Sequence, residues 1–170
     1  NPVGVADYTG GGQREVALIR TPHIGGILIV YRPAGLYLDR FMAVPGLSNH
    51  AIGSRELQLH WVGDIDGDGM ADIATVSLRN QDNGSGDDVM GERRGSGKFY
   101  IILSSDIHAT SPGTITKLAD VGLAWMGEWG GDALGYGVDS MGDFDGDGLD
   151  DISAGSYGNS ENGIYAGKSY

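Results

Sequence analysis

Aspartates alternate with other residues in two nine-residue segments of this sequence, 64–72 and 143–151. In each segment positions 1, 3, 5 and 9 are Asp, and positions 4 and 6 are Gly. Carboxylates at this spacing on a tightly coiled loop can point inward together, and the carbonyl of position 7 can add another oxygen ligand. Calcium is a hard cation that takes six to eight oxygens. The spacing therefore predicts two calcium sites.

The predicted ligands occupy the same positions in both loops. They are Asp64, Asp66, Asp68, the carbonyl of Met70 and Asp72 in one loop, and Asp143, Asp145, Asp147, the carbonyl of Leu149 and Asp151 in the other. The glycines supply the positive φ angles that such coiling requires. We expect the apolar neighbours to anchor each loop in the core, and they are Ile65, Ile73, Phe144 and Ile152.

Two other interpretations of these loops are open. An EF-hand shares the first three acids but needs a bidentate Glu at position 12, where this chain has Thr75 or Ala154, and it needs flanking helices. A solvated Asp/Gly-rich turn without metal is the other alternative. It is disfavoured because four converging carboxylates repel one another strongly without a cation.

The two loops belong to a longer internal repeat. A weaker third copy runs from Asp7 to Glu15, where Thr9 and Gly11 replace two inner acids. Similar apolar segments follow each loop, including 26–31, 97–103 and 167–170. We therefore expect three copies of one unit, at 1–44, 45–120 and 121–170, with two calcium ions and none in the first copy.

The apolar segments are short, rich in Ile, Val and Tyr, and bounded by Gly, Asn and Asp, which is typical of strands. Residues 57–61 alternate as a half-buried strand does, and the best helix candidate, 115–123, is interrupted by Gly122. The chain is predicted to be all-β. A unit of about four strands fits a β-propeller blade, and typical rings have four to eight blades. We expect an incomplete ring or a fragment of a larger propeller, with both chain ends inside repeats.

These loops, with Gly131-Asp132-Ala133-Leu134-Gly135 and Ala166-Gly167-Lys168-Ser169-Tyr170, resemble FG-GAP repeats. Those repeats form the calcium-binding β-propellers of integrin α-subunits and of many secreted bacterial proteins. The resemblance implies one calcium ion per intact loop, on one face of the ring. The chain departs from the pattern at Leu134, where the family often has Phe, at Thr9 and Gly11, and in a polar insertion at 83–94.

Composition limits the partners. Asp plus Glu outnumber Lys plus Arg by 23 to 11, and the formal net charge is -12, which argues against nucleic acid and anionic membranes. No apolar run approaches the length of a membrane helix, so no membrane insertion is expected. Calcium modules with dissociation constants of about 10⁻⁴ to 10⁻³ M would be largely empty in cytosol, which favours an extracellular, secreted or cell-surface location.

Catalysis is not predicted. The histidines (His23, His50, His60 and His108) lack metal-ligand spacing, no Gly-x-Ser-x-Gly motif occurs, and the clustered acids are assigned to calcium. Trp61, Trp125 and Trp129 could form a sugar- or protein-binding surface, but we expect them to pack inside the fold and between blades. We expect 83–94 to form a surface loop, and such loops often carry recognition. The favoured function is a non-catalytic binding or adhesion module for a protein or glycan, with further blades or other chains completing the ring. The alternatives are an accessory scaffold domain of a larger secreted hydrolase or lyase, and a structural subunit of a surface assembly.

Overall fold

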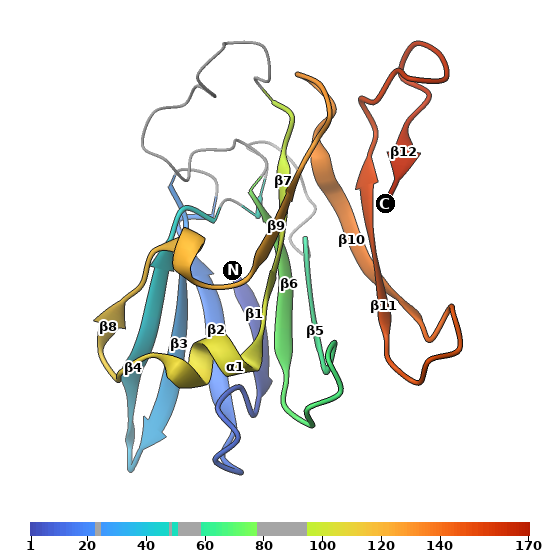
Figure 1. Cartoon of the computed structure of the whole chain (residues 1–170). Helices are drawn as coiled ribbons and strands as arrows, with labels where there is room; N and C mark the ends of the chain where they lie inside the picture. The colour runs from blue at the N-terminus through green and yellow to red at the C-terminus, as the bar shows by residue number, and fades with distance from the viewer. Residues whose placement is uncertain (23–24, 48, 51–58, 78–94) are drawn as a thin grey trace.

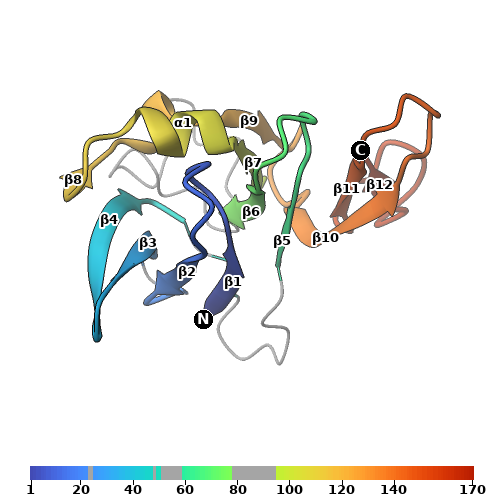
Figure 2. The ribbon, with the colours of Figure 1, turned by 90° about the horizontal axis from the view of Figure 1, so that it is seen from below.

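The computed structural model describes residues 1–22, 25–47, 49–50, 59–77 and 95–170. Within these ranges the strands form three open sheets, and the all-β prediction is confirmed at this level. Figure 2 shows the three sheets standing side by side across the molecule. No helix in the described ranges has the length and apolar character needed to cross a bilayer.

The first sheet is an antiparallel meander. It contains β1 (Pro2–Ala6), β2 (Glu15–Arg20), β3 (Ile27–Ala34) and β4 (Tyr37–Pro45), each paired with the next. A fifth short strand, β8 (Thr114–Ile115), pairs in parallel with β4. β8 comes from much later in the chain, so it ties the first sheet to the second.

The second sheet has the strand order β5 (His60–Gly63), β6 (Asp72–Ser77), β7 (Lys98–Ile102) and β9 (Leu123–Met126), all antiparallel. Residues 57 and 58 of the predicted alternating strand lie outside the described residues, and the strand is seen from His60. The third sheet has the order β10, β11 and β12. These strands are Leu134–Gly142, Asp151–Ser156 and Lys168–Ser169.

The connection from β7 to β9 contains the two short helices of the described chain. The helix α1 (Ser104–Ala109) follows β7, and the 3-10 helix η1 (Leu118–Asp120) follows β8. The sequence did not predict α1, because six residues are too few to show a helical period. Between these helices the chain reaches the outer edge of the first sheet and then returns to the second.

Strand pairing follows one pattern in all three sheets. The residue before each loop pairs with its ninth position: Ala6 with Glu15, Gly63 with Asp72, and Gly142 with Asp151. The next pair of strands matches as well: Arg20 with Ile27, Ser77 with Lys98, and Ser156 with Lys168. The three units therefore share their strand register even though the connections between these strands differ in length.

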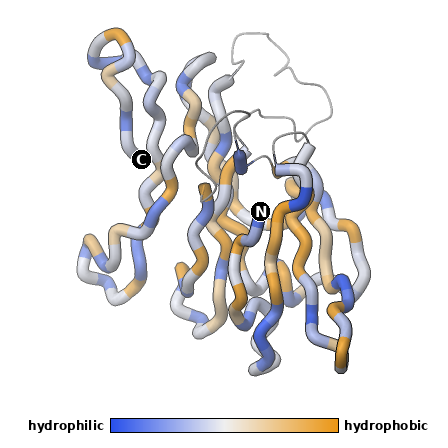
Figure 3. The backbone as a smooth tube through the Cα atoms, turned by 180° about the vertical axis from the view of Figure 1, so that it is seen from behind, coloured by the Kyte–Doolittle hydropathy of each residue, from blue (hydrophilic) through white to orange (hydrophobic). Residues whose placement is uncertain are grey.

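Apolar residues fill the spaces between neighbouring sheets. One buried cluster joins the first sheet, through residues such as Ile19 and Leu28, to Ile102 of β7 and Ile107 of α1. A second cluster joins the second and third sheets and includes Val76, Phe99, Leu134, Val138 and Ala154. Figure 3 shows hydrophobic residues gathered along the strands of the first sheet.

Candidate metal sites

Three loops with the same start and end points lie at one end of the molecule, the lower end in Figure 1. They connect β1 to β2, β5 to β6 and β10 to β11, and we name them loop 1 (7–15), loop 2 (64–72) and loop 3 (143–151). In each loop the ninth position is also the first residue of the second strand. The hairpin therefore fixes the ninth side chain relative to the other acids.

The first acid of loops 2 and 3 organises the turn through backbone N–H groups. Asp64 accepts hydrogen bonds from Gly67 at 2.8 Å and Gly69 at 2.9 Å. Asp143 accepts the equivalent bonds from Gly146 at 2.7 Å and Gly148 at 3.1 Å. All four glycines have positive φ, which an L side chain rarely adopts. The prediction that these glycines coil the loops is confirmed.

The ninth acid holds the start of each loop. Asp72 accepts a 2.7 Å bond from the N–H of Ile65, and Asp151 accepts a 2.8 Å bond from the N–H of Phe144. A carboxylate has about four lone-pair sites, and Asp72 and Asp151 each use one more of these for a second N–H bond, from Ser104 and Asp145 respectively. The first and ninth acids thus keep acceptor capacity for an ion while they fix the loop.

Each loop brings three of its acids together. Oxygens of Asp64, Asp66 and Asp72 lie within 4.8 Å of one another, and so do oxygens of Asp143, Asp145 and Asp151. We call these two groups the acid triads. A triad offers only hard oxygen donors, which suits a hard cation such as calcium.

The fifth acid stands outside the triad in both loops. Asp68 accepts bonds from the N–H of Met70 at 2.8 Å and from the hydroxyl of Ser104 at 2.8 Å. Asp147 accepts a 2.8 Å bond from the N–H of Leu149. The roles of Asp68, Asp147 and the Met70 and Leu149 carbonyls as ligands stay predictions.

The triads concentrate negative charge. Two like unit charges about 4 Å apart repel by about 1 kcal/mol in water and about 4 kcal/mol at an effective dielectric constant of 20. Burial raises the pKa of Asp72, and the charge of Asp66 raises it further, whereas the N–H groups of Ser104 and Ile65 lower it. A bound cation would offset both the cost of burying the charge of Asp72 and the repulsion between the carboxylates.

The anchoring residues behave differently in the two loops. Ile73 is fully buried, and Ile65 and Ile152 pack partly buried against the second cluster. Phe144, however, is 77% exposed, so its prediction as a core anchor is wrong. Loop 2 lies between loops 1 and 3, and Ser104 at the start of α1 bonds to two of its acids. Asp72 is accordingly buried and Asp151 only partly so.

The loops contact one another in sequence order. The N–H of Ala71 in loop 2 donates a 2.9 Å bond to the carbonyl of Asp7 in loop 1. The side chain of Met70, at the seventh position of loop 2, lies over Gly10, at the fourth position of loop 1. Leu149 in loop 3 lies over Gly67 in loop 2 in the same way. One contact rule therefore relates each loop to the next.

Loop 1 keeps the backbone turn of the other loops and an acid at its first and ninth positions, but it lacks their two inner acids. Asp7 accepts a 2.8 Å bond from the N–H of Gly12, and Glu15 accepts a 2.9 Å bond from the N–H of Tyr8. Within the described residues no acid triad forms here. Arg32 of β3 instead lies 3.3 Å from the buried Glu15 carboxylate. Arg32 and Ser104 were not predicted as loop contacts, because nothing in their local sequence shows which loop each one reaches.

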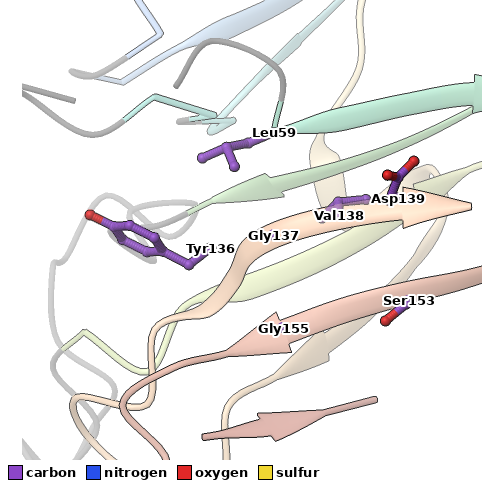
Figure 4. Close-up of a pocket in the computed structure, with 7 residues that line it drawn as sticks. All are labelled: Leu59, Tyr136, Gly137, Val138, Asp139, Ser153 and Gly155. Atoms are coloured by element: carbon purple, nitrogen blue, oxygen red, sulfur yellow. The ribbon is translucent and has the colours of Figure 1, made fainter. Parts of the chain in front are cut away.

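No clear catalytic set lines the hollow drawn in Figure 4. The hollow has a volume of about 490 Å³ and is lined by Leu59, Tyr136, Gly137, Val138, Asp139, Ser153 and Gly155 (Figure 4). Asp139 is the one carboxylate among these lining residues, and Figure 4 places it at the opposite end from Tyr136. The expectation that the chain is not an enzyme stays a prediction.

Two tryptophans are more exposed than predicted. Trp125 is 47% exposed and packs one side against Phe99, with ring centroids 5.7 Å apart, and Trp129 is 68% exposed. Trp61 is partly buried against the second cluster, as expected. The predicted recognition loop at 83–94 lies outside the described residues.

No protein-family model matches this chain, and no curated protein matches it either. The resemblance to FG-GAP repeats thus rests on the motifs quoted above.

Proposed function

We propose that this chain is a calcium-stabilised extracellular binding or adhesion module of the FG-GAP propeller type, with one calcium ion in loop 2 and one in loop 3. The observation that carries the proposal is the pair of matching acid triads, each set on a hairpin and held by the same backbone N–H bonds. Two sites built alike from distant parts of the chain argue for a common ligand.

The donor set favours calcium over magnesium. Calcium accepts six to eight oxygens in flexible geometry, whereas magnesium demands a near-ideal octahedron and keeps several waters. Three converging carboxylates, with the fifth acid and the seventh carbonyl close by in sequence, suit the more flexible ion. Thiolate metals are excluded because the chain has no Cys.

The three sheets support a propeller arrangement as successive blades. They share strand register, carry their loops at the same end, and contact one another through one rule from loop to loop. A propeller consists of similar blades repeated around a central axis, so each blade makes the same contact with the next. Further blades or other chains would complete the ring.

A binding role is supported by exposed aromatic residues on and near the third sheet. Tyr136 and Tyr157 contact edge to face, with ring centroids 4.7 Å apart, and both are exposed, as is Trp129. Tyrosine and tryptophan present apolar area with a polar group and are enriched at binding surfaces. The partner we propose is a protein or a glycan.

Melting experiments with and without a chelator test the calcium proposal. With dissociation constants of about 10⁻⁴ to 10⁻³ M and about 1 mM calcium, each site stabilises the fold by roughly 0.4 to 1.4 kcal/mol. We expect chelation to lower the Tm by about 2 to 11 °C for two sites. Asp66→Asn combined with Asp145→Asn should remove most of this sensitivity.

The chain offers a matched control. Asp150 lies in loop 3 but is not a predicted ligand, so Asp150→Asn changes the charge without touching the triad. This variant should keep the chelator response. A melting curve of the wild type that does not move on chelation would refute the proposal.

A further inference from the structure

Loop 1 contains a buried carboxylate, that of Glu15, and the guanidinium of Arg32 lies beside it. Glu15 is fully buried, and one of its oxygens accepts a 2.7 Å bond from the Thr9 hydroxyl and lies 3.3 Å from Nε of Arg32. Nη2 of Arg32 donates a 2.9 Å bond to the Thr9 hydroxyl oxygen. The guanidinium therefore joins the side chains of Thr9 and Glu15.

These two positions are third and ninth in loop 1. In loops 2 and 3 the same positions are Asp66 with Asp72 and Asp145 with Asp151, and both pairs belong to the acid triads. The guanidinium of Arg32 thus bridges the two positions that a metal ion would bridge in the other loops. No comparable basic side chain is described at either of the triads.

The position of Arg32 is itself set by the sheet. It lies on β3, and its guanidinium carbon is 4.2 Å from the centroid of the Phe41 ring on β4. Counting from the matched pairs Arg20–Ile27 and Ser77–Lys98, Arg32 corresponds to Leu103 in the second sheet. An Arg side chain stays charged at every physiological pH, so this cation cannot be lost by titration or dilution.

We propose that the guanidinium of Arg32 takes the place of a metal ion in loop 1, so that this loop closes without calcium. The comparison with metal rests on the calcium sites proposed above, whereas the role of Arg32 in holding Thr9 and Glu15 does not. The first sheet is then calcium-independent, and the calcium response is confined to loops 2 and 3. Loop 1 is also a latent calcium site, closed by a residue of the chain itself.

Calcium titration followed by NMR amide resonances tests this division. The N–H groups of Gly12, Gly69 and Gly148 donate to the first acids of loops 1, 2 and 3, so each amide reports on one loop. In the wild type the resonances of Gly69 and Gly148 should shift as calcium is added, and that of Gly12 should stay in place. A Gly12 resonance that titrates with the others would overturn the proposal.

Removing Arg32 tests its role without any metal. Arg32→Leu, which introduces the residue found at the corresponding position 103, should lower the Tm by about 6 to 12 °C in chelator, because it leaves Glu15 buried without its cation. Arg40→Leu is the control, since Arg40 lies on the same sheet and, among the described residues, donates its hydrogen bond to the carbonyl of Gly113 rather than to loop 1. Equal and small effects of the two variants would refute the proposal.

Opening the latent site is the converse experiment. Arg32→Leu combined with Thr9→Asp and Gly11→Asp restores the acids of the other loops. Gly11 has no positive φ, and a Cβ there meets only the Thr9 hydroxyl at 3.8 Å, so Asp fits. In this triple variant the Gly12 resonance should titrate with calcium, and a resonance that stays fixed in the folded variant counts against the proposal. If loops 2 and 3 fail to respond in the wild type, the calcium proposal fails, while Arg32→Leu still reports on loop 1.

Discussion

The backbone N–H of Ser104 donates a 2.7 Å hydrogen bond to Oδ1 of Asp72, and the Ser104 hydroxyl donates a 2.8 Å bond to Oδ2 of Asp68. Ser104 is the first residue of α1, which follows the third strand of the second sheet. The start of α1 therefore fixes two acids of loop 2. This contact explains why loop 2 is better covered than loop 3.

Ser104→Ala should destabilise the protein by about 1.5 to 3 kcal/mol, because it removes a hydrogen bond to a charged group. The backbone bond to Asp72 remains, so the fold is kept. Ser105→Ala is the control, since Ser105 is the next residue of α1 and is exposed. Urea unfolding of both variants measures the difference, and equal midpoints would contradict this role of Ser104.

Leu149 lies so close to Gly67 that a Cβ added at Gly67 would be 2.7 Å from Cδ2 of Leu149. Gly69 has a similar positive φ but open space around it. Each Gly→Ala change should lower the free energy of unfolding by about 1 to 2 kcal/mol, because the Ala side chain is strained on left-handed backbone. We expect Gly67→Ala to cost more than Gly69→Ala, because Leu149 must also move.

A double-mutant cycle isolates the contact between loops 2 and 3. In a Leu149→Ala background, Gly67→Ala and Gly69→Ala should lower the free energy of unfolding by the same amount, because the Leu149 methyl group that clashes with residue 67 is gone. Thermal unfolding measures all the variants. If the two alanine variants already match in the wild-type background, Leu149 does not pack over Gly67 in solution.

His60 should make the fold sensitive to mild acid. Burial lowers the pKa of His60 below its usual value near 6.5, the N-terminal ammonium lowers it further, and a hydrogen bond to the backbone of Val3 opposes the shift. At pH values between the folded and unfolded pKa of His60, the unfolded chain binds more protons than the folded chain. The stability that depends on neutral His60 is therefore fully present above about pH 6.5 and is lost as the pH falls.

The comparison of wild type with His60→Gln isolates this effect. Urea midpoints measured at pH 7.5 and pH 5.5, at a fixed calcium concentration, should show the wild type losing stability relative to the variant at the lower pH. A difference between the two proteins that is the same at both pH values would show that His60 does not titrate in this way.

The sequence predicts the loops and their hairpins well, because their chemistry is local. Asp64 and Asp143 bond to N–H groups within their own loops, so spacing alone determines the coil. The short apolar segments likewise predict the strands that follow each loop. The three sheets and their common register agree with the internal repeat.

Local sequence patterns do not predict the long-range contacts of the loops. Arg32 reaches Glu15, and Ser104 reaches Asp68 and Asp72, only after three strands have been placed side by side. Phe144 has the same local pattern as Ile65 but lies on an outer surface, so its exposure depends on neighbours that the motif does not specify. The chain between β7 and β9 crosses to the first sheet and back, and no local pattern predicts that route.

The most direct test of the account is a crystal structure from a calcium-containing solution, with an anomalous difference map. We expect two calcium peaks, one among the carboxylates of Asp64, Asp66 and Asp72 and one among those of Asp143, Asp145 and Asp151, with oxygen distances of about 2.3 to 2.6 Å. No peak is expected beside Arg32. Well-ordered loops without anomalous density at either triad would contradict the central claim.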